Sequence, residues 1–146
     1  MNTVIRLMKE ADREAVLDMM RVFYRSPAVY TDGSEEIFQN DVDACLNDEP
    51  YLEGYVFEGD KGLQGYAMIA KSFSTEFGKR CIWLEDLYVV EAYRRQGIGK
   101  ALFALLQEKY RDAILRLEVE EDNHTARKLY ESQGMETLPY LEMIRF

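Results

Sequence analysis

The run from Arg94 to Lys100 carries the clearest chemical signature in this chain of 146 residues. It reads Arg94-Arg95-Gln96-Gly97-Ile98-Gly99-Lys100 and joins a long apolar segment to a helical pattern. A glycine-rich turn at the start of a helix leaves backbone N–H groups free and lets a phosphate approach them closely. The helix dipole adds about half a positive charge at that end, and three basic side chains supplement it. The run therefore predicts a binding site for an anion.

Two common phosphate-binding motifs do not fit this run. A Walker loop requires Gly where Arg94 stands and Ser or Thr where Ala101 stands. A dinucleotide-binding loop requires a third Gly where Leu102 stands. The pattern that does fit, from Arg94 through Gly99, is Arg-x-x-Gly-x-Gly.

Two adjacent carboxylates, Glu85 and Asp86, lie just before this run. They interrupt a segment, 82–90, that is otherwise apolar on both faces and therefore typical of a central strand. A carboxylate in such a strand is expected to titrate unusually, which makes Glu85 a candidate proton acceptor. Strand alternation places Asp86 on the opposite face unless a bulge intervenes.

Charge and composition exclude several classes of function. The net charge of −9 disfavours a nucleic-acid partner, and the single His with two scattered Cys gives no metal-ligand spacing. The two thiols are expected to stay reduced. No apolar run reaches the length of a membrane span and the start lacks the pattern of a signal peptide, so a cytoplasmic location is expected. The charge is uneven: positions 31–60 hold ten acids without a base, and 91–116 hold six bases.

Apolar spacing predicts one domain over residues 1–146, a mixed α/β (α+β) fold with a mostly antiparallel sheet. Strands are expected at 4–8, 51–58, 63–72, 80–90 and 113–119, and helices at 12–24, 32–46, 96–110 and 125–133. Asp32 and Glu35 resemble a capping box that opens the second helix. Residues 135–146 are expected to form a hairpin broken around Pro139.

Two motifs in this order resemble those of the GNAT (Gcn5-related N-acetyltransferase) superfamily. The first is Arg-x-x-Gly-x-Gly preceded by Leu84-Glu85-Asp86-Leu87-Tyr88-Val89-Val90, similar to the family's acetyl-CoA signature. The second is Asn123-x-x-Ala126-x-x-Leu129-Tyr130-x-x-x-Gly134-Met135, where the family usually ends in Gly-Phe. The resemblance implies about four helices around the sheet, with a splay between the central strand and the next one. It also implies transfer of an acetyl group from acetyl-CoA to an amine, without a metal.

The resemblance assigns roles to particular residues. The cofactor would contact the main chain of Leu87, Tyr88 and Val89, the loop residues Arg94, Arg95, Gln96, Gly97, Ile98, Gly99 and Lys100, and Asn123. Asn123 is also a good helix N-cap by residue type. Glu85 is the candidate base, with Glu118 on the neighbouring strand as a rival. Tyr130 is the candidate acid, against the alternative of a buried core tyrosine.

The acceptor is expected to be a small cationic amine such as a polyamine or diamine. In the superfamily the first two helices wall the acceptor site, and here that stretch carries the acidic run and aromatics that include Tyr24, Tyr30 and Phe38. Tyr30 and Glu85 are therefore the candidate acceptor-binding residues. A solvated acidic surface, a protein N-terminal or lysine acetyltransferase and a non-catalytic coenzyme A-binding module stay open as alternatives. The resemblance also suggests a homodimer in contact through its C-terminal strands.

Overall fold

The strands and helices follow one another along the chain in an order close to the one expected. The computed structural model describes residues 2–47 and 49–146, so Asp48 of the acidic run lies outside the described residues. The elements are β1 (Val4–Leu7), η1 (Glu10–Asp12), α1 (Arg13–Phe23), α2 (Glu35–Leu46), β2 (Leu52–Gly59), β3 (Gly62–Ser74), β4 (Lys79–Val89), η2 (Glu91–Tyr93), α3 (Ile98–Lys109), β5 (Ile114–Leu117) and α4 (His124–Ser132). Among these residues, no helix has the length and apolar character needed to cross a membrane.

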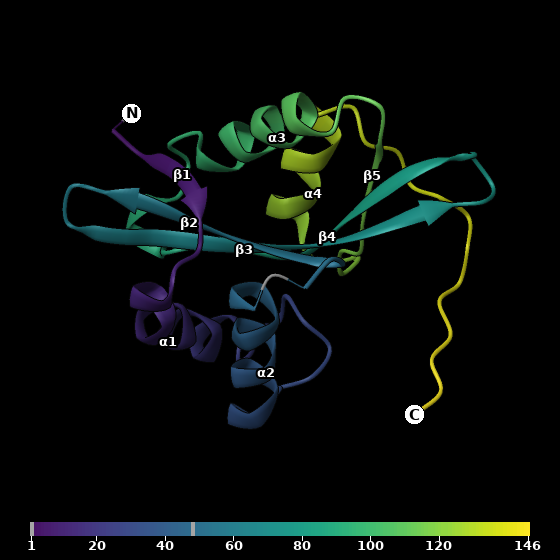
Figure 1. Cartoon of the computed structure of the whole chain (residues 1–146). Coiled ribbons are helices and arrows are strands. Elements are labelled where there is room, and N and C mark those ends of the chain that lie inside the picture. The colour runs from purple at the N-terminus through teal and green to yellow at the C-terminus, as the bar shows by residue number, and fades with distance from the viewer. Residues whose placement is uncertain (1, 48) are drawn as a thin grey trace.

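One five-stranded sheet organises the molecule, in the order β1-β2-β3-β4-β5. The first three pairings are antiparallel and β4 pairs with β5 in parallel. Helices α1 and α2 cover one face of the sheet, and α3 and α4 cover the other (Figure 1). The expected fold, a mostly antiparallel sheet flanked by four helices, is confirmed.

Each face of the sheet has its own apolar core. Under α1 and α2, buried residues at helical spacing, such as Val16, Met20 and Phe23, pack against Tyr66 and Tyr88 of the sheet. Under α3 and α4, the core contains Phe57, Ile69, Ile82, Leu84, Leu102 and Phe103. Residues of β3 and β4 supply both cores, which explains why these two strands are apolar on both faces.

The central strand β4 carries a bulge at the position of the paired carboxylates. Met68 of β3 pairs with Asp86, whereas the next residue, Ile69, pairs with Leu84, so Glu85 is the extra residue. An extra residue reverses the alternation of side chains beyond it. Leu84 and Leu87 consequently both pack on the α3 side.

Strand β5 pairs only with the part of β4 that precedes this bulge. Its ladder with β4 runs from Cys81 to Leu84, and Glu85–Val89 of β4 has no strand partner on the β5 side among the described residues. The splay expected between the central strand and the next one is therefore present.

Two expectations about local structure are wrong. Helix α2 is capped by Ser34, whose hydroxyl accepts a hydrogen bond from the Ile37 N–H at 3.2 Å, and not by Asp32. Gly33, with φ of 64°, turns the chain between Asp32 and that cap. Residues 135–146 form no strand, because a strand exists only by pairing and this segment has no neighbouring strand among the described residues.

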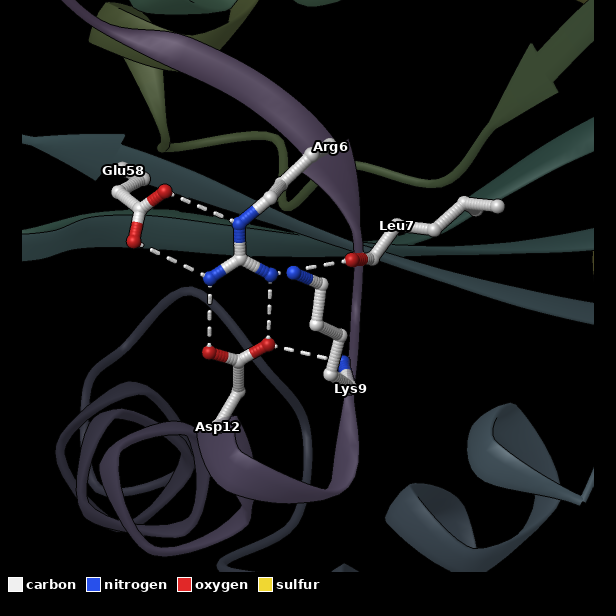
Figure 2. A network of polar contacts seen from close by, with 5 residues as sticks. All are labelled: Arg6, Leu7, Lys9, Asp12 and Glu58. Atoms are coloured by element: carbon white, nitrogen blue, oxygen red, sulfur yellow. Dashed lines mark hydrogen bonds and ion pairs between the residues drawn. The ribbon is translucent and has the colours of Figure 1, made fainter.

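A charged cluster ties the first strand to the first helix and to β2 (Figure 2). The Arg6 guanidinium donates to both oxygens of Asp12 at 2.8 and 3.0 Å, and also to Glu58 at 3.1 and 3.3 Å. Asp12 is buried and also accepts a hydrogen bond from the Lys9 N–H at 2.8 Å. These contacts hold the pKa of Asp12 below its usual range, mainly through the Arg6 hydrogen bonds.

The substitution Arg6→Ala should destabilise the protein by about 2–3 kcal/mol, because it leaves the buried Asp12 carboxylate without its cation. The expected loss is below that of a fully buried pair, because Arg6 is partly exposed. Because the folded-state pKa of Asp12 is lowered, the stability from this pair is present at neutral pH and lost as the pH falls through that pKa. Urea unfolding at pH 7 and at pH 3 measures both effects.

A matched control is Arg21→Ala, which removes a bidentate pair with the exposed Glu35 and should change the unfolding free energy far less. Equal losses for the two variants would contradict the role given to Arg6.

Candidate active site

The loop before α3 adopts the conformation of an anion-binding turn. Gly97 is the N-cap of α3 with φ of 85°, and Arg95 has φ of 63°, a left-handed conformation that is uncommon for a residue other than Gly. The backbone N–H groups of residues 96–100 donate no hydrogen bond to another residue in the described chain. They are available to a ligand at the positive end of a helix of twelve residues.

The two glycines of the loop serve different purposes. A Cβ on Gly97 would meet nothing within 4 Å, so this glycine is required by its backbone conformation. A Cβ on Gly99 would lie 2.7 Å from Cδ2 of Leu129, so this glycine lets α4 pack closely against α3. The spacing in the sequence predicts that both glycines face the ligand, whereas the structure links Gly99 to helix packing.

The three bases of the loop also differ in their surroundings. Arg94 donates from Nε to the Val89 carbonyl at 2.8 Å, and its guanidinium lies 5.7 Å from the centre of the Tyr88 ring. These contacts brace the loop against the end of β4. Arg95 and Lys100 are exposed and form no ion pair with another described residue, so their charges are free to meet an anion.

The free stretch of β4 leads directly into this loop. Leu87, Tyr88 and Val89 lie beyond the last residue paired with β5, so a ligand lying in the splay would run along their main chain toward the N-terminus of α3. Asn123 stands on the other side of the splay, after β5. Its Oδ1 accepts a hydrogen bond from the Ala126 N–H at 3.3 Å, which confirms the N-cap reading of this residue.

An acidic cavity of about 380 Å³ lies between α2 and the sheet, beside the bulge. Three carboxylates reach it: Asp41 of α2 with Glu85 and Asp86 of β4. Its other lining residues include Tyr24, Tyr51 and Lys71. The Lys71 ammonium is engaged by Glu53 at 3.8 Å. In the part of the chain that is described, no group of three or more His, Cys, Asp or Glu is placed to hold a metal ion.

The three carboxylates oppose one another's ionisation. Burial, followed by the charges of Asp86 and Glu85, raises the pKa of Asp41 to about 6. Burial also raises the pKa of Glu85, and the Asp86 charge adds to this effect. Asp86 is buried between two tyrosine hydroxyls, which donate to it from Tyr24 at 2.9 Å and from Tyr66 at 2.8 Å. A cation in the cavity would relieve this repulsion.

A second, larger cavity of about 800 Å³ lies between β5, α3, α4 and the C-terminal segment. Tyr130 lines it, packs against Phe103 with the two ring centroids 5.9 Å apart, and makes no side-chain hydrogen bond to another described residue. Burial raises the pKa of this tyrosine to about 12, so its hydroxyl keeps its proton near neutral pH. Glu118 lines the same cavity, and its pKa is raised to about 7 by a hydrogen bond with Glu142, by burial and by the charges of Glu142 and Glu85.

The acidic run contributes less to this site than its sequence suggested. Several of its members are paired with cations elsewhere: Glu35 with Arg21, Asp43 with Arg13, Glu53 with Lys109 and Glu58 with Arg6. Tyr30 is 93% exposed and is not part of the cavity wall, and Phe38 is buried in the core.

Asp41 and Tyr51 are the residues that the sequence argument did not single out. A signal for Asp41 existed, because it shares a helix face with the buried Phe38 and Val42 and with Cys45. An acid on an apolar helix face is unusual. Tyr51, just before β2, carried no comparable signal.

A protein-family model matches most of the chain. The model described as "Acetyltransferase (GNAT) family" matches residues 13–135, which span β4, the glycine loop, β5 and α4. The chain belongs to the acetyltransferase (GNAT) family, and membership makes it an acyl-CoA-dependent acetyltransferase by class.

Two curated relatives act on amines according to their names. The chain is 38% identical over 81 residues to the thialysine N-epsilon-acetyltransferase of Bos taurus, an alignment covering 53% of this chain and 47% of that protein. This match therefore spans about half the length of the bovine protein. The chain is 27% identical over 142 residues to the spermine/spermidine N(1)-acetyltransferase of Bacillus subtilis (strain 168), covering 93% of this chain and 89% of that protein.

Solved structures share the fold at low sequence identity. The aminoglycoside acetyltransferase AAC(6')-Iy, in complex with a bisubstrate analogue of CoA, superposes with a TM-score of 0.81 at 16% identity, covering 100% of this chain and 99% of that one. The ribosomal-protein-alanine N-acetyltransferase of Brucella melitensis biovar Abortus 2308 superposes with a TM-score of 0.74 at 20% identity, covering 99% of each chain.

The substitution Gly97→Ala should destabilise the protein by about 1–2 kcal/mol, because a side chain is forced into the left-handed conformation. No clash contributes, since the space around this position is open. Gly97→Asn should cost less, because Asn tolerates that conformation better than Ala. Chemical denaturation of the three proteins measures the order, and equal stability of Gly and Ala would contradict the backbone argument.

Proposed function

We propose that this protein transfers an acetyl group from acetyl-CoA to a primary amine of a small cationic acceptor. The observation that carries the proposal is the splay: β4 loses its β5 partner after Leu84, between a glycine loop at a helix N-terminus and a cavity of three carboxylates. One side of the splay suits a diphosphate and the other suits an ammonium group, and the free main chain of β4 lies between them.

The residues around the splay fit coenzyme A. The free N–H groups of residues 96–100, with the charges of Arg95 and Lys100, would hold the diphosphate. The main chain of Leu87, Tyr88 and Val89 would pair with the amides of the pantetheine arm, as an added strand does. Arg94 would support this arrangement by holding the loop on the Val89 carbonyl.

Acetyl-CoA supplies a thioester carbonyl that an uncharged amine can attack. A free alkyl amine has a pKa near ~10.4, so it must lose a proton before it attacks. Glu85 is the proposed proton acceptor, directly or through water, because it lines the acceptor cavity at the bulge and has a raised pKa. Glu118 is the alternative acceptor of the proton, with a pKa of about 7.

Tyr130 is the proposed acid for the leaving sulfur. Its hydroxyl is protonated near neutral pH, unengaged by other described residues and directed at a cavity that Leu117 and Val119 of the β5 side also line. The packing of its ring on Phe103 fixes the position of the hydroxyl. These properties suit a group that holds a proton until it is needed.

The acceptor class follows from the carboxylates. Asp41, Glu85 and Asp86 share one cavity with the aromatic rings of Tyr24 and Tyr51, a set of groups that favours a polyamine or diamine. The names of the bovine and bacterial relatives, which specify thialysine and spermine/spermidine, support an amine of this kind. A cytoplasmic location, a single domain and a homodimer complete the proposal.

Tyr130→Phe should lower kcat by about 10²-fold while the KM for acetyl-CoA changes little, because the variant loses a proton donor but keeps the ring. Release of free thiol, measured with spermidine as acceptor, follows turnover. The matched control is Tyr110→Phe, which removes a hydroxyl bonded to Glu53 at 2.8 Å near the other end of α3. Unchanged kcat for Tyr130→Phe would remove the acid assignment.

Asp41→Asn should raise the KM for spermidine about tenfold, because the variant removes one charged partner of the ammonium group. In the parent protein that KM should also rise as the pH falls through about 6, because Asp41 then loses its charge. Asp43→Asn is the control: the same kind of change on the same helix, at an acid paired with Arg13.

Activity assays on a panel of amines test the proposed class of acceptor. Activity confined to neutral or anionic amines would refute the polyamine assignment, and preference for peptides would favour protein acetylation. Binding of acetyl-CoA without transfer to any amine would favour a non-catalytic module.

A further inference from the structure

Asp86 is a buried carboxylate that has no cation beside it in the part of the chain that is described. Its exposed fraction is 5%, and it belongs to none of the ion pairs among those residues. Two tyrosine hydroxyls take the place of a cation: Oδ1 accepts from Tyr24 at 2.9 Å and Oδ2 from Tyr66 at 2.8 Å. Burying a carboxylate in this way costs free energy, so its presence beside the acidic cavity points to a function.

The two tyrosines differ in their access to the cavity. Tyr66 is fully buried, does not line the cavity, and its hydroxyl bonds to no described residue other than Asp86. If Asp86 took up a proton on Oδ2, this hydroxyl would be left without its acceptor in the interior of the fold. Tyr24 is partly exposed and lines the cavity. The Tyr66 contact therefore favours the ionised form of Asp86.

Aromatic packing fixes the positions of both hydroxyls. The Tyr66 ring packs edge-on against Phe23 of α1, with the two centroids 6.3 Å apart and the planes at 88°. The Tyr24 ring packs against the same Phe23 at 5.3 Å and against Phe38 of α2 at 5.2 Å. Rings held between two helices and the sheet have little freedom to turn their hydroxyls away from Asp86.

The charge of Asp86 acts on the two other acids of the cavity. After burial, this charge is the largest cause that raises the pKa of Asp41 across the cavity and of Glu85 next to it in the chain. The other titratable groups that face these carboxylates are Tyr24, Tyr66, Cys45 of α2, Glu118 and Glu142. Among the described residues of the cavity wall, Lys71 is the one cation, and Glu53 engages it.

The bulge gives the two neighbouring acids of β4 different access to a ligand. The side chain of Glu85, the extra residue, is accessible, whereas that of Asp86 is enclosed by the two tyrosines. An acceptor amine can therefore reach Glu85 directly, whereas Asp86 influences it mainly through its charge.

We propose that Asp86 is a positioning residue of the acceptor site, a fixed negative charge that acts through Glu85 and does not touch the reacting atoms. Tyr66 and Tyr24 keep this charge ionised and in place. The charge raises the proton affinity of Glu85, so that Glu85 can accept a proton from the amine near neutral pH. This inference rests on the proposed function, because it concerns the proton acceptor of that reaction.

A titration without substrates tests the fixed charge directly. NMR spectra of the side-chain carboxyl carbons follow the pKa of Asp41, which is about 6 in the parent chain. The substitution Asp86→Asn should lower this pKa by about one pH unit, because a neighbouring negative charge is removed. An unchanged pKa of Asp41 in Asp86→Asn would overturn the proposal.

Tyr66→Phe tests the part played by the tyrosine. Its hydrogen bond lowers the pKa of Asp86, so the variant should keep Asp86 protonated to higher pH. The pKa of Asp41 should then lie between its values in the parent chain and in Asp86→Asn. If Asp86→Asn does not fold, this variant decides the question by itself.

The matched control is Tyr55→Phe, which removes the hydroxyl of another buried tyrosine that donates to a carboxylate, Glu53, beneath α3. Both tyrosine variants should lose stability, but only Tyr66→Phe should change the pKa of Asp41. Loss of stability without that change would reduce the Tyr66 contact to a structural one and overturn its proposed role.

Turnover separates this inference from the proposed function. In the parent chain kcat/KM for spermidine should rise with pH as Glu85 loses its proton, and this rise should occur about one pH unit lower in Asp86→Asn. The ionisation of the amine itself contributes equally in both proteins. A rise at the same pH in both would overturn the positioning role and leave acetyl transfer intact. Absence of transfer by the parent chain to any amine would overturn both.

Discussion

One extra residue in the central strand governs the geometry of this molecule. Because Glu85 has no pairing partner on β3, side-chain alternation in β4 reverses there. Leu84 and Leu87 can then both serve the α3 core, while Asp86 enters the layer beneath α1 and α2. The parallel ladder with β5 stops at Leu84, the residue before the bulge. The same irregularity thus accompanies both the open main chain of the splay and the entry of carboxylates into the acidic cavity.

Electrostatics in the protein follow two opposite patterns. Around Arg6 the acids are neutralised by a guanidinium with several short contacts, and the pKa of Asp12 falls. In the acidic cavity the acids lack such a partner, and the pKa of Asp41 rises to about 6. Burying the Asp86 carboxylate without a cation costs stability, and the hydroxyls of Tyr24 and Tyr66 that donate to it offset part of this cost. The fold tolerates this loss of stability. A positively charged ligand in the cavity would recover part of the lost free energy, because its charge would offset the repulsion among the carboxylates.

The two edge strands of the sheet, β1 and β5, have different surroundings. At the β1 edge Arg6 and its carboxylate partners supply charge that opposes further pairing. The β5 edge instead adjoins the cavity of about 800 Å³, whose wall includes Leu138, Tyr140 and Glu142 of the C-terminal segment. Glu118 and Tyr130, two of the proposed catalytic groups, line that same cavity.

The sequence by itself determined the order of elements, the glycine loop and the family, because apolar periodicity and the Arg-x-x-Gly-x-Gly spacing are local properties of the chain. It also singled out Glu85 and Tyr130 as candidates, since they belong to motifs with fixed spacing. Tertiary structure alone decided which acids share a cavity: four acids of the acidic run are paired with distant arginines and lysines, whereas Asp41 reaches Glu85 and Asp86. The prediction of a hairpin over residues 135–146 is wrong for a related reason. Its residues favour an extended backbone, but a strand needs a neighbour, and pairing between segments far apart, or between two chains, is not encoded in local spacing.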